Sequence, residues 1–138
     1  MKNMPDKISI TILTEGIKDL RLLKEWGDYL AKPDKEENNR SGKDRITKDK
    51  VSTSQLRRFF GAIKRIQADF DGLSGEVLLL EPKLAYAVGR DKNKTKLKDL
   101  YDLLSPLIRG ISEDRARFQN FVNVLEAIVA YHKAAGGE

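Results

Sequence analysis

Residues 52–67, STSQLRRFFGAIKRIQ, form the clearest helical segment of the 138-residue chain. Ser52 is a good N-cap, and Gln55 follows three residues later, which is the spacing of a capping box, with Thr53 and Ser54 as alternative N-caps. At about 100° per residue, one side of the predicted helix is apolar. That side consists of Leu56, Phe59, Phe60, Ile63, Ile66 and Phe70. The segment is therefore predicted to be an amphipathic helix that packs on a core.

The opposite side of this helix is basic and has a glycine at its centre. Arg57, Arg58, Lys64 and Arg65 fall within about 120° of one another on the helical wheel, with Gly61 among them. Glycine inside a helix costs about 0.5–1 kcal/mol relative to alanine, so its presence needs an explanation. In one interpretation, the bare backbone lets phosphates or sugars approach, and the cations bind them. In the other, Gly61 admits a neighbouring helix and the cations are merely solvated.

The rest of the chain predicts an all-α fold, a bundle of about five helices in a single domain of residues 1–138. Apolar residues at helical spacing predict further helices over 15–31, 76–90, about 94–109 and about 113–135. Pro82 is expected to kink or break the helix at 76–90, and Pro106 to disturb the end of the next one.

The first 50 residues divide into an arm, a helix and a linker. Residues 8–13, ISITIL, alternate as a strand does, but a lone strand needs a partner, so we expect an extended arm or part of a turn. No other strand is predicted. Residues 1–32 thus comprise this arm and the first helix. Residues 33–50 contain one strong hydrophobe and are predicted to be a flexible polar linker before the helical core at 51–138. Such a linker also allows two isolated copies to exchange the first helix and form a homodimer.

The positive charge is concentrated in the middle of the chain. The formal net charge is +5, and between residues 51 and 98 ten basic residues face five acidic ones, which accounts for the whole excess. Local basic charge suggests a polyanionic partner, and a basic surface that only aids solubility is the alternative. Arg90 and Lys92 belong to a basic run after the third helix. Tyr86, one turn before Arg90, is expected to pack in the core rather than to stack on a base.

The sequence contains no recognisable catalytic or cofactor-binding pattern. There is no cysteine, which excludes disulfides, thiolate metal sites and cysteine nucleophiles. His132, the single histidine, lies on the apolar side of the last helix and is predicted to be buried and hydrogen-bonded. No Walker motif or nucleophile elbow is present. We therefore expect no enzyme activity, no metal and no cofactor. Without a signal peptide's apolar run or a span long enough for a bilayer, a cytoplasmic protein with no membrane contact is the expectation.

Three segments follow one another in the chain: VSTSQLRRFF (51–60), LAYAVGR (84–90) and FQNFVNVLEAIVAYHKAAGG (118–137). The first is a threonine/serine-rich turn followed by a hydrophobe and arginine, and the second is an aromatic-x-x-glycine-arginine segment. The third is an aromatic-rich helix that ends in alanine-tyrosine, a basic residue and glycines. Together they resemble the small helical subunit of type III-A CRISPR (Csm) effector complexes. The resemblance covers about residues 51–137, and residues 1–50 contain no matching motif.

The resemblance implies an all-α, non-catalytic subunit that stacks in copies along a ribonucleoprotein filament for antiviral defence. Such a subunit contacts guide RNA, target RNA and other effector subunits, including its own copies, while cleavage belongs to the backbone subunit. The motifs single out Arg57 and Arg90, and the helical wheel and the basic run add the others. The candidate RNA-binding residues are Arg57, Arg58, Gly61, Lys64, Arg65, Arg90 and Lys92. Two alternatives stay open: a helical protein–protein adaptor without nucleic-acid contact, and a DNA-binding protein, for which no helix-turn-helix spacing is evident.

Overall fold

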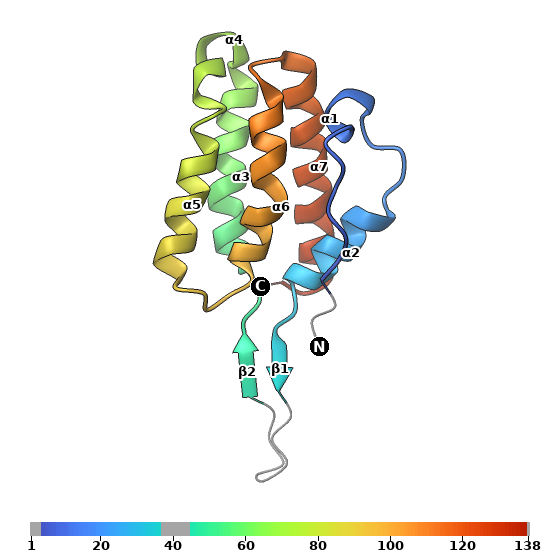
Figure 1. Ribbon diagram of the computed structural model, residues 1–138, viewed down its shortest axis with the longest axis vertical. Helices are drawn as coiled ribbons and strands as arrows, with labels where there is room; N and C mark the ends of the chain where they lie inside the picture. The colour runs from blue at the N-terminus through green and yellow to red at the C-terminus, as the bar shows by residue number, and fades with distance from the viewer. Residues whose placement is uncertain (1–3, 37–44, 138) are drawn as a thin grey trace.

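A computed structural model describes residues 4–36 and 45–137, which form helices beside a short two-stranded sheet (Figure 1). The helices are α1 (Ile12–Glu15), α2 (Arg21–Leu30), α3 (Thr53–Ala68), α4 (Phe70–Leu73), α5 (Leu80–Asp91), α6 (Leu97–Ile111) and α7 (Arg115–Ala134). The five longest correspond to the five predicted helices, so a mostly helical fold is confirmed. The one-turn helices α1 and α4, and a 3-10 turn over Ser74–Glu76, were not predicted.

Helix α7 lies at the centre of the bundle and supplies much of its core. Its side chains Phe118, Phe121, Leu125 and Ile128 are at most 2% exposed. Helices α1, α2, α3 and α6 all contact it. Figure 1 shows α3 and α5 on one side of the molecule and α1 and α2 on the other. Helix α3 therefore lies away from the N-terminal helices. Within the described residues, no helix has the length and apolar character needed to cross a bilayer.

Helix α2 crosses α7 at a glycine, and this close approach explains a residue that otherwise weakens the helix. A Cβ atom built on Gly27 would lie 2.5 Å from Tyr131 Cβ and 2.8 Å from the backbone nitrogen of His132. Trp26, beside it, is buried and donates a hydrogen bond from its indole nitrogen to the carbonyl oxygen of Asp6 at 2.8 Å. The first predicted helix thus packs on α7 of the same chain.

The two described ends of the predicted linker pair with each other. Strands β1 (Asp34–Glu36) and β2 (Arg45–Lys48) are antiparallel, with Lys35 opposite Ile46. The prediction that no further strand is present is therefore wrong. The polar composition shows no strand pattern, because the pairing depends on backbone hydrogen bonds and on buried contacts at its base. The predicted flexibility also concerns residues 37–44, which lie outside the described residues.

Of the two interpretations of residues 8–13, the turn is confirmed. The backbone N–H groups of Ile12 and Leu13 donate to the carbonyl oxygens of Ser9 and Ile10, each at 3.1 Å, and α1 begins at Ile12. Leu13 is 1% exposed, and its carbonyl oxygen accepts a hydrogen bond from Asn120 Nδ2 at 2.7 Å. Ile8 is buried as well, whereas Ile10 is 53% exposed, so the alternating isoleucines do not share one buried face.

The two prolines lie at different positions in their helices. Helix α5 begins at Leu80, so Pro82 lies in its first turn, where a backbone N–H has no acceptor within the helix. The helix runs without interruption through Pro82, so the predicted break at this residue is wrong, and the helix begins at Leu80 instead of residue 76. Helix α6 also continues through Pro106 to Ile111, so the expected disturbance of its end is wrong. Helix α6 has buried residues as far as its last residue, Ile111. These core contacts outweigh the backbone hydrogen bond that Pro106 cannot donate.

Candidate nucleic-acid interface

The start of α3 is fixed by hydrogen bonds as predicted. The backbone N–H of Gln55 donates to Ser52 Oγ at 3.1 Å, and that of Ser52 donates to Gln55 Oε1 at 2.8 Å, which completes the capping box. Just before it, Val51 is buried, and its N–H donates to the carbonyl oxygen of Leu30 at 2.9 Å. These contacts set the rotation of α3, so that its apolar side faces the core and its basic side faces solvent.

Gly61 lies on the open surface of α3. No atom would come within 4 Å of a Cβ built on it, and the neighbouring Arg57, Lys64 and Arg65 are exposed. The interpretation in which Gly61 admits another helix of the same chain is therefore wrong for the part of the chain that the structure describes. The bare backbone between these cations is accessible to a partner molecule.

Ion pairs divide the predicted basic side of α3 into two parts. Arg65 pairs with Glu76, and Lys64 Nζ lies 3.9 Å from Glu126 Oε2. The charges of these two cations are thus partly neutralised within the chain. Among the described residues, the two arginines nearer the start of α3 have no such ion pair. The part of the basic side best placed to attract an external anion is therefore its first half.

A groove of about 580 Å³ lies between α3 and α5. Arg58 lines it from α3 and Arg90 from α5, so two of the predicted residues come together there. Lys83 and Lys94 also line the groove, and neither belongs to the predicted set. Lys83 lies seven residues before Arg90, which is two helical turns, so helical spacing alone identifies it as a neighbour. Lys92, at the end of α5, lies outside the groove lining.

Much of the groove lining is apolar, and one tyrosine there is exposed. Phe59 and Leu84 are buried beneath it, and Ala62 and Ala87 contribute small side chains. Tyr86 is 69% exposed, so the expectation that it packs in the core is wrong. The tyrosine lies on the side of α5 that faces solvent, whereas the opposite side of the same helix packs in the core. The groove thus combines an apolar interior, a free aromatic ring and a basic rim.

Asp91 shapes the turn that follows α5. Its carboxylate accepts hydrogen bonds from the backbone N–H and from Oγ1 of Thr95, each at 3.0 Å, and Gln55 Nε2 lies 3.5 Å away. Lys92 ends the helix in a left-handed conformation, with a φ of 52°. This turn places Lys94 at the groove. Asp91 is the one acidic residue among those that line it, and its oxygens are already engaged.

Glu81 fastens α5 to α6 and so fixes one wall of the groove. Its carboxylate accepts hydrogen bonds from Arg109 Nε at 3.0 Å, Tyr101 Oη at 2.8 Å and Ser105 Oγ at 3.2 Å. The hydrogen bond from Arg109, followed by that from Tyr101, holds the pKa of Glu81 below its ordinary value. Glu81 is therefore ionised at neutral pH, and its carboxylate links α5 to α6.

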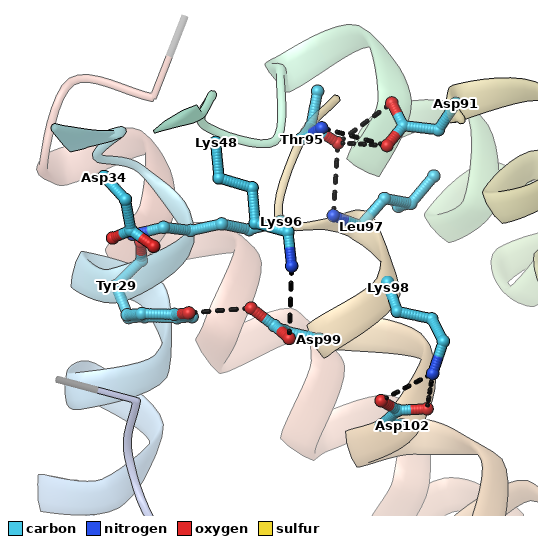
Figure 2. A network of polar contacts seen from close by, with 10 residues as sticks. All are labelled: Tyr29, Asp34, Lys48, Asp91, Thr95, Lys96, Leu97, Lys98, Asp99 and Asp102. Carbon is cyan, nitrogen blue, oxygen red and sulfur yellow. Dashed lines mark hydrogen bonds and ion pairs between the residues drawn. The ribbon is translucent and has the colours of Figure 1, made fainter. Parts of the chain in front are cut away.

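Lys96, in the basic run after α5, is buried and does not face a ligand. Its Nζ donates to the carbonyl oxygen of Tyr29 at 2.9 Å and lies 3.1 Å from Asp34 Oδ1. Tyr29 Oη donates in turn to Asp99 Oδ2 at 2.7 Å, and Lys48 Nζ lies 3.9 Å from Asp99 Oδ1 (Figure 2). Burial, reinforced by this hydrogen bond to Asp99, raises the pKa of Tyr29. These charges tie the base of the β1–β2 pair to α2 and α6.

The described residues contain no group of three or more histidine, cysteine or acidic side chains arranged to hold a metal ion. His132 is 1% exposed, and its Nε2 lies 2.6 Å from the carbonyl oxygen of Val51, so the prediction of a buried, hydrogen-bonded histidine is confirmed.

A family model described as Csm2 Type III-A matches residues 34–138. The match covers more than half of the chain, and it begins at β1 and includes all three sequence motifs. It therefore extends the resemblance noted in the sequence to the β1–β2 pair. No curated protein and no solved structure matches the chain.

Proposed function

Because this chain belongs to the Csm2 Type III-A family, and is thus a small subunit of type III-A CRISPR effector complexes, we propose that it binds RNA without cleaving it. The proposed contact is the basic surface, which we define as the seven predicted residues together with the two lysines of the groove. These are Arg57, Arg58, Gly61, Lys64, Arg65, Lys83, Arg90, Lys92 and Lys94. Guide and target RNA are the proposed ligands.

The observation that supports this proposal most directly is the gathering of cations without ion pairs on one side of the molecule. Arg57 and Arg58 from α3 and Arg90 from α5 are exposed and, among the residues that the structure describes, lack a carboxylate partner. An exposed cation without an ion pair is solvated unless a ligand binds it, so these arginines are available to a ligand. Phosphate oxygens form charge-assisted hydrogen bonds with arginine, often in a bidentate geometry. Gly61 adds room for the RNA backbone to approach α3.

Binding to the RNA backbone fits a division of labour in which base pairing selects the sequence. In RNA-guided systems the protein holds the heteroduplex by its shape and phosphates, and the guide reads the target. Cations on an exposed helical surface provide contacts of this kind, because they do not depend on which bases are present. The expected binding is therefore independent of sequence and decreases steeply with salt.

The test is a fluorescence anisotropy titration of the purified chain with a labelled single-stranded RNA at several salt concentrations. The test variant is Arg57→Gln/Arg58→Gln/Arg90→Gln. The control, Lys18→Gln/Arg21→Gln/Lys24→Gln, removes the same charge on the opposite side, where each cation already pairs with an acid of its own. We expect the test variant to fold normally, to bind RNA more weakly and to show a smaller dependence of log K on log salt. Equal losses in the two variants would contradict the proposed surface.

Contacts with other effector subunits follow from family membership, and we propose that copies of the chain stack side by side. Two adjacent leucines just before α5, Leu78 and Leu79, are 61% and 50% exposed and offer an apolar contact for such a neighbour. If the chain is a protein–protein adaptor without RNA contact, Gly61→Leu should impair assembly and leave the RNA affinity of the isolated chain unchanged. If Gly61 faces RNA, the same variant should weaken RNA binding.

A further inference from the structure

We propose that the groove between α3 and α5 holds one unpaired nucleotide, with its base stacked on Tyr86 and its phosphates bound by the cations of the rim. This inference rests on the proposed RNA-binding function and adds what that function lacks, a site for a base. It also explains why an aromatic ring is exposed beside the basic surface.

The size and lining of the groove fit a flat, partly apolar ligand. Its volume of about 580 Å³ lies within the range of about 300–1,000 Å³ that is common for small-molecule sites. Phe59 and Leu84 are buried beneath it, and Ala62 and Ala87 are too small to fill it. The helices therefore leave an apolar space that their own side chains do not occupy.

Tyr86 is the side chain that gives this space a stacking partner. It is 69% exposed, and among the described residues its hydroxyl has no hydrogen-bond partner. A base stacked on an aromatic ring is a contact that tolerates any base, because each base has a π face. A ring held on α5, one helical turn from Arg90, supplies such a platform with an arginine beside it.

The charges around the groove favour a phosphate-bearing ligand. Arg58, Lys83, Arg90 and Lys94 line it, whereas its single acid, Asp91, is held by Thr95. The same groove is thus lined by four cations and by apolar side chains, a combination that suits a base inside it and phosphates at its edge. An acidic peptide would satisfy the cations, but it would not need an exposed aromatic ring between them.

The ligand must be unpaired because a base in a duplex does not expose its face. Within a double helix each base is stacked on its neighbours and paired at its edge, so an aromatic side chain cannot reach its π surface. The groove is therefore expected to distinguish single-stranded from double-stranded RNA, whereas the rest of the basic surface binds the backbone of both.

The test compares wild type, Tyr86→Ala and Tyr86→Phe in titrations with a labelled single-stranded RNA and with the same strand annealed to its complement. Because Tyr86 is exposed, both variants are expected to fold, which circular dichroism checks. We expect Tyr86→Ala to bind the single strand at least about fivefold more weakly, as for loss of one base–aromatic stack. Tyr86→Phe keeps the ring and should retain the affinity. Neither variant should change binding of the duplex by more than about twofold.

The outcomes separate this inference from the proposed function. If Tyr86→Ala binds the single strand as well as wild type does, while Arg57→Gln/Arg58→Gln/Arg90→Gln binds it weakly, the nucleotide site is wrong and the basic surface stands. The nucleotide site is also wrong if Tyr86→Ala weakens single strand and duplex equally. If neither set of substitutions changes RNA binding, the proposed function fails together with the site.

Discussion

The imidazole Nε2 of His132, near the end of α7, lies 2.6 Å from the carbonyl oxygen of Val51, just before α3. A carbonyl oxygen only accepts, so Nε2 carries a proton and donates it to Val51. The contact joins the first and the last of the three sequence motifs. Gly137 packs against the same ring, where an added Cβ would overlap it. Gly137 thus covers the ring of His132, and the histidine holds the start of α3 in place.

This contact predicts that the protein is less stable in mild acid. Burial lowers the pKa of His132 below its ordinary value of 6.5, opposed in part by the hydrogen bond to Val51 and assisted by the positive charge of Lys50. Below about pH 6.5 the unfolded chain binds a proton that the folded chain excludes, so the free energy of unfolding decreases as pH falls towards the folded-state pKa. Urea denaturation at pH 7.5 and pH 5.5 measures the decrease.

The control for this prediction is His132→Gln, which has no titratable group at this position. Its free energy of unfolding should be lower than that of wild type at pH 7.5, but should change less between the two pH values. Since His132 is the single histidine, other groups that titrate in this range are common to both proteins. An equal pH dependence in wild type and variant would contradict the assignment to His132.

Two helical glycines are expected to respond in opposite directions to the same substitution. Gly27→Ala forces a Cβ to within 2.5 Å of Tyr131 at the α2–α7 crossing, and it should lower the free energy of unfolding by about 1–3 kcal/mol. Gly61→Ala adds a Cβ in open space and should raise it by about 0.5–1 kcal/mol, as for a solvent-exposed helix position. Chemical denaturation followed by circular dichroism measures both. If both substitutions change the free energy of unfolding in the same direction, one of the two glycines does not have the surroundings that the structure gives it.

The lysines of the run after α5 should differ sharply in their effect on stability. Lys96→Met removes the buried member of the ion pair with the half-buried Asp34, and should lower the free energy of unfolding by several kcal/mol, towards the range of about 3–5 kcal/mol for a broken buried pair. Lys98→Met breaks an exposed i,i+4 pair with Asp102 and should cost about 0.3–0.5 kcal/mol. Thermal and urea denaturation compare the two. If Lys96→Met is as mild as Lys98→Met, the buried charges do not hold the β1–β2 pair to the bundle.

Ion pairs within the chain predict a ranking of cations in RNA binding. Arg57→Gln should reduce the slope of log K against log salt for single-stranded RNA by about 0.7, the value for one phosphate contact. Arg65→Gln should have a smaller effect, because Glu76 already pairs with this arginine. Glu76→Gln should strengthen RNA binding, because it removes a negative charge and releases Arg65. Equal slopes for the two arginine variants, or weaker binding by Glu76→Gln, would contradict the ranking.

The sequence by itself determined the parts of this protein that depend on local spacing. The capping box of Ser52 and Gln55 locates the start of α3, and the 3.6-residue period separates its apolar and basic sides. The same period places His132 inside. The family motifs are contiguous segments on these helices, so the sequence by itself indicates the family. Each of these properties follows from neighbours within a few residues of one another, whose relative positions the helix fixes.

The tertiary structure alone decided which of the cations are free. On a helical wheel, Lys64 and Arg65 lie on the same basic side as Arg57 and Arg58. The acidic residues that pair with the first two, Glu126 and Glu76, belong to other elements. In the same way, Lys96 and Lys98 share one run of sequence, but only the first points into the bundle.

The groove is a tertiary feature as well. It forms where α3 and α5 lie side by side, and the exposure of Tyr86 depends on which side of α5 the core has filled. The residues that line the groove are far apart in the sequence, so no local pattern predicts that they meet. Which charges meet and which spaces stay open is decided by how the helices pack, and packing depends on the sum of many distant contacts rather than on any local pattern.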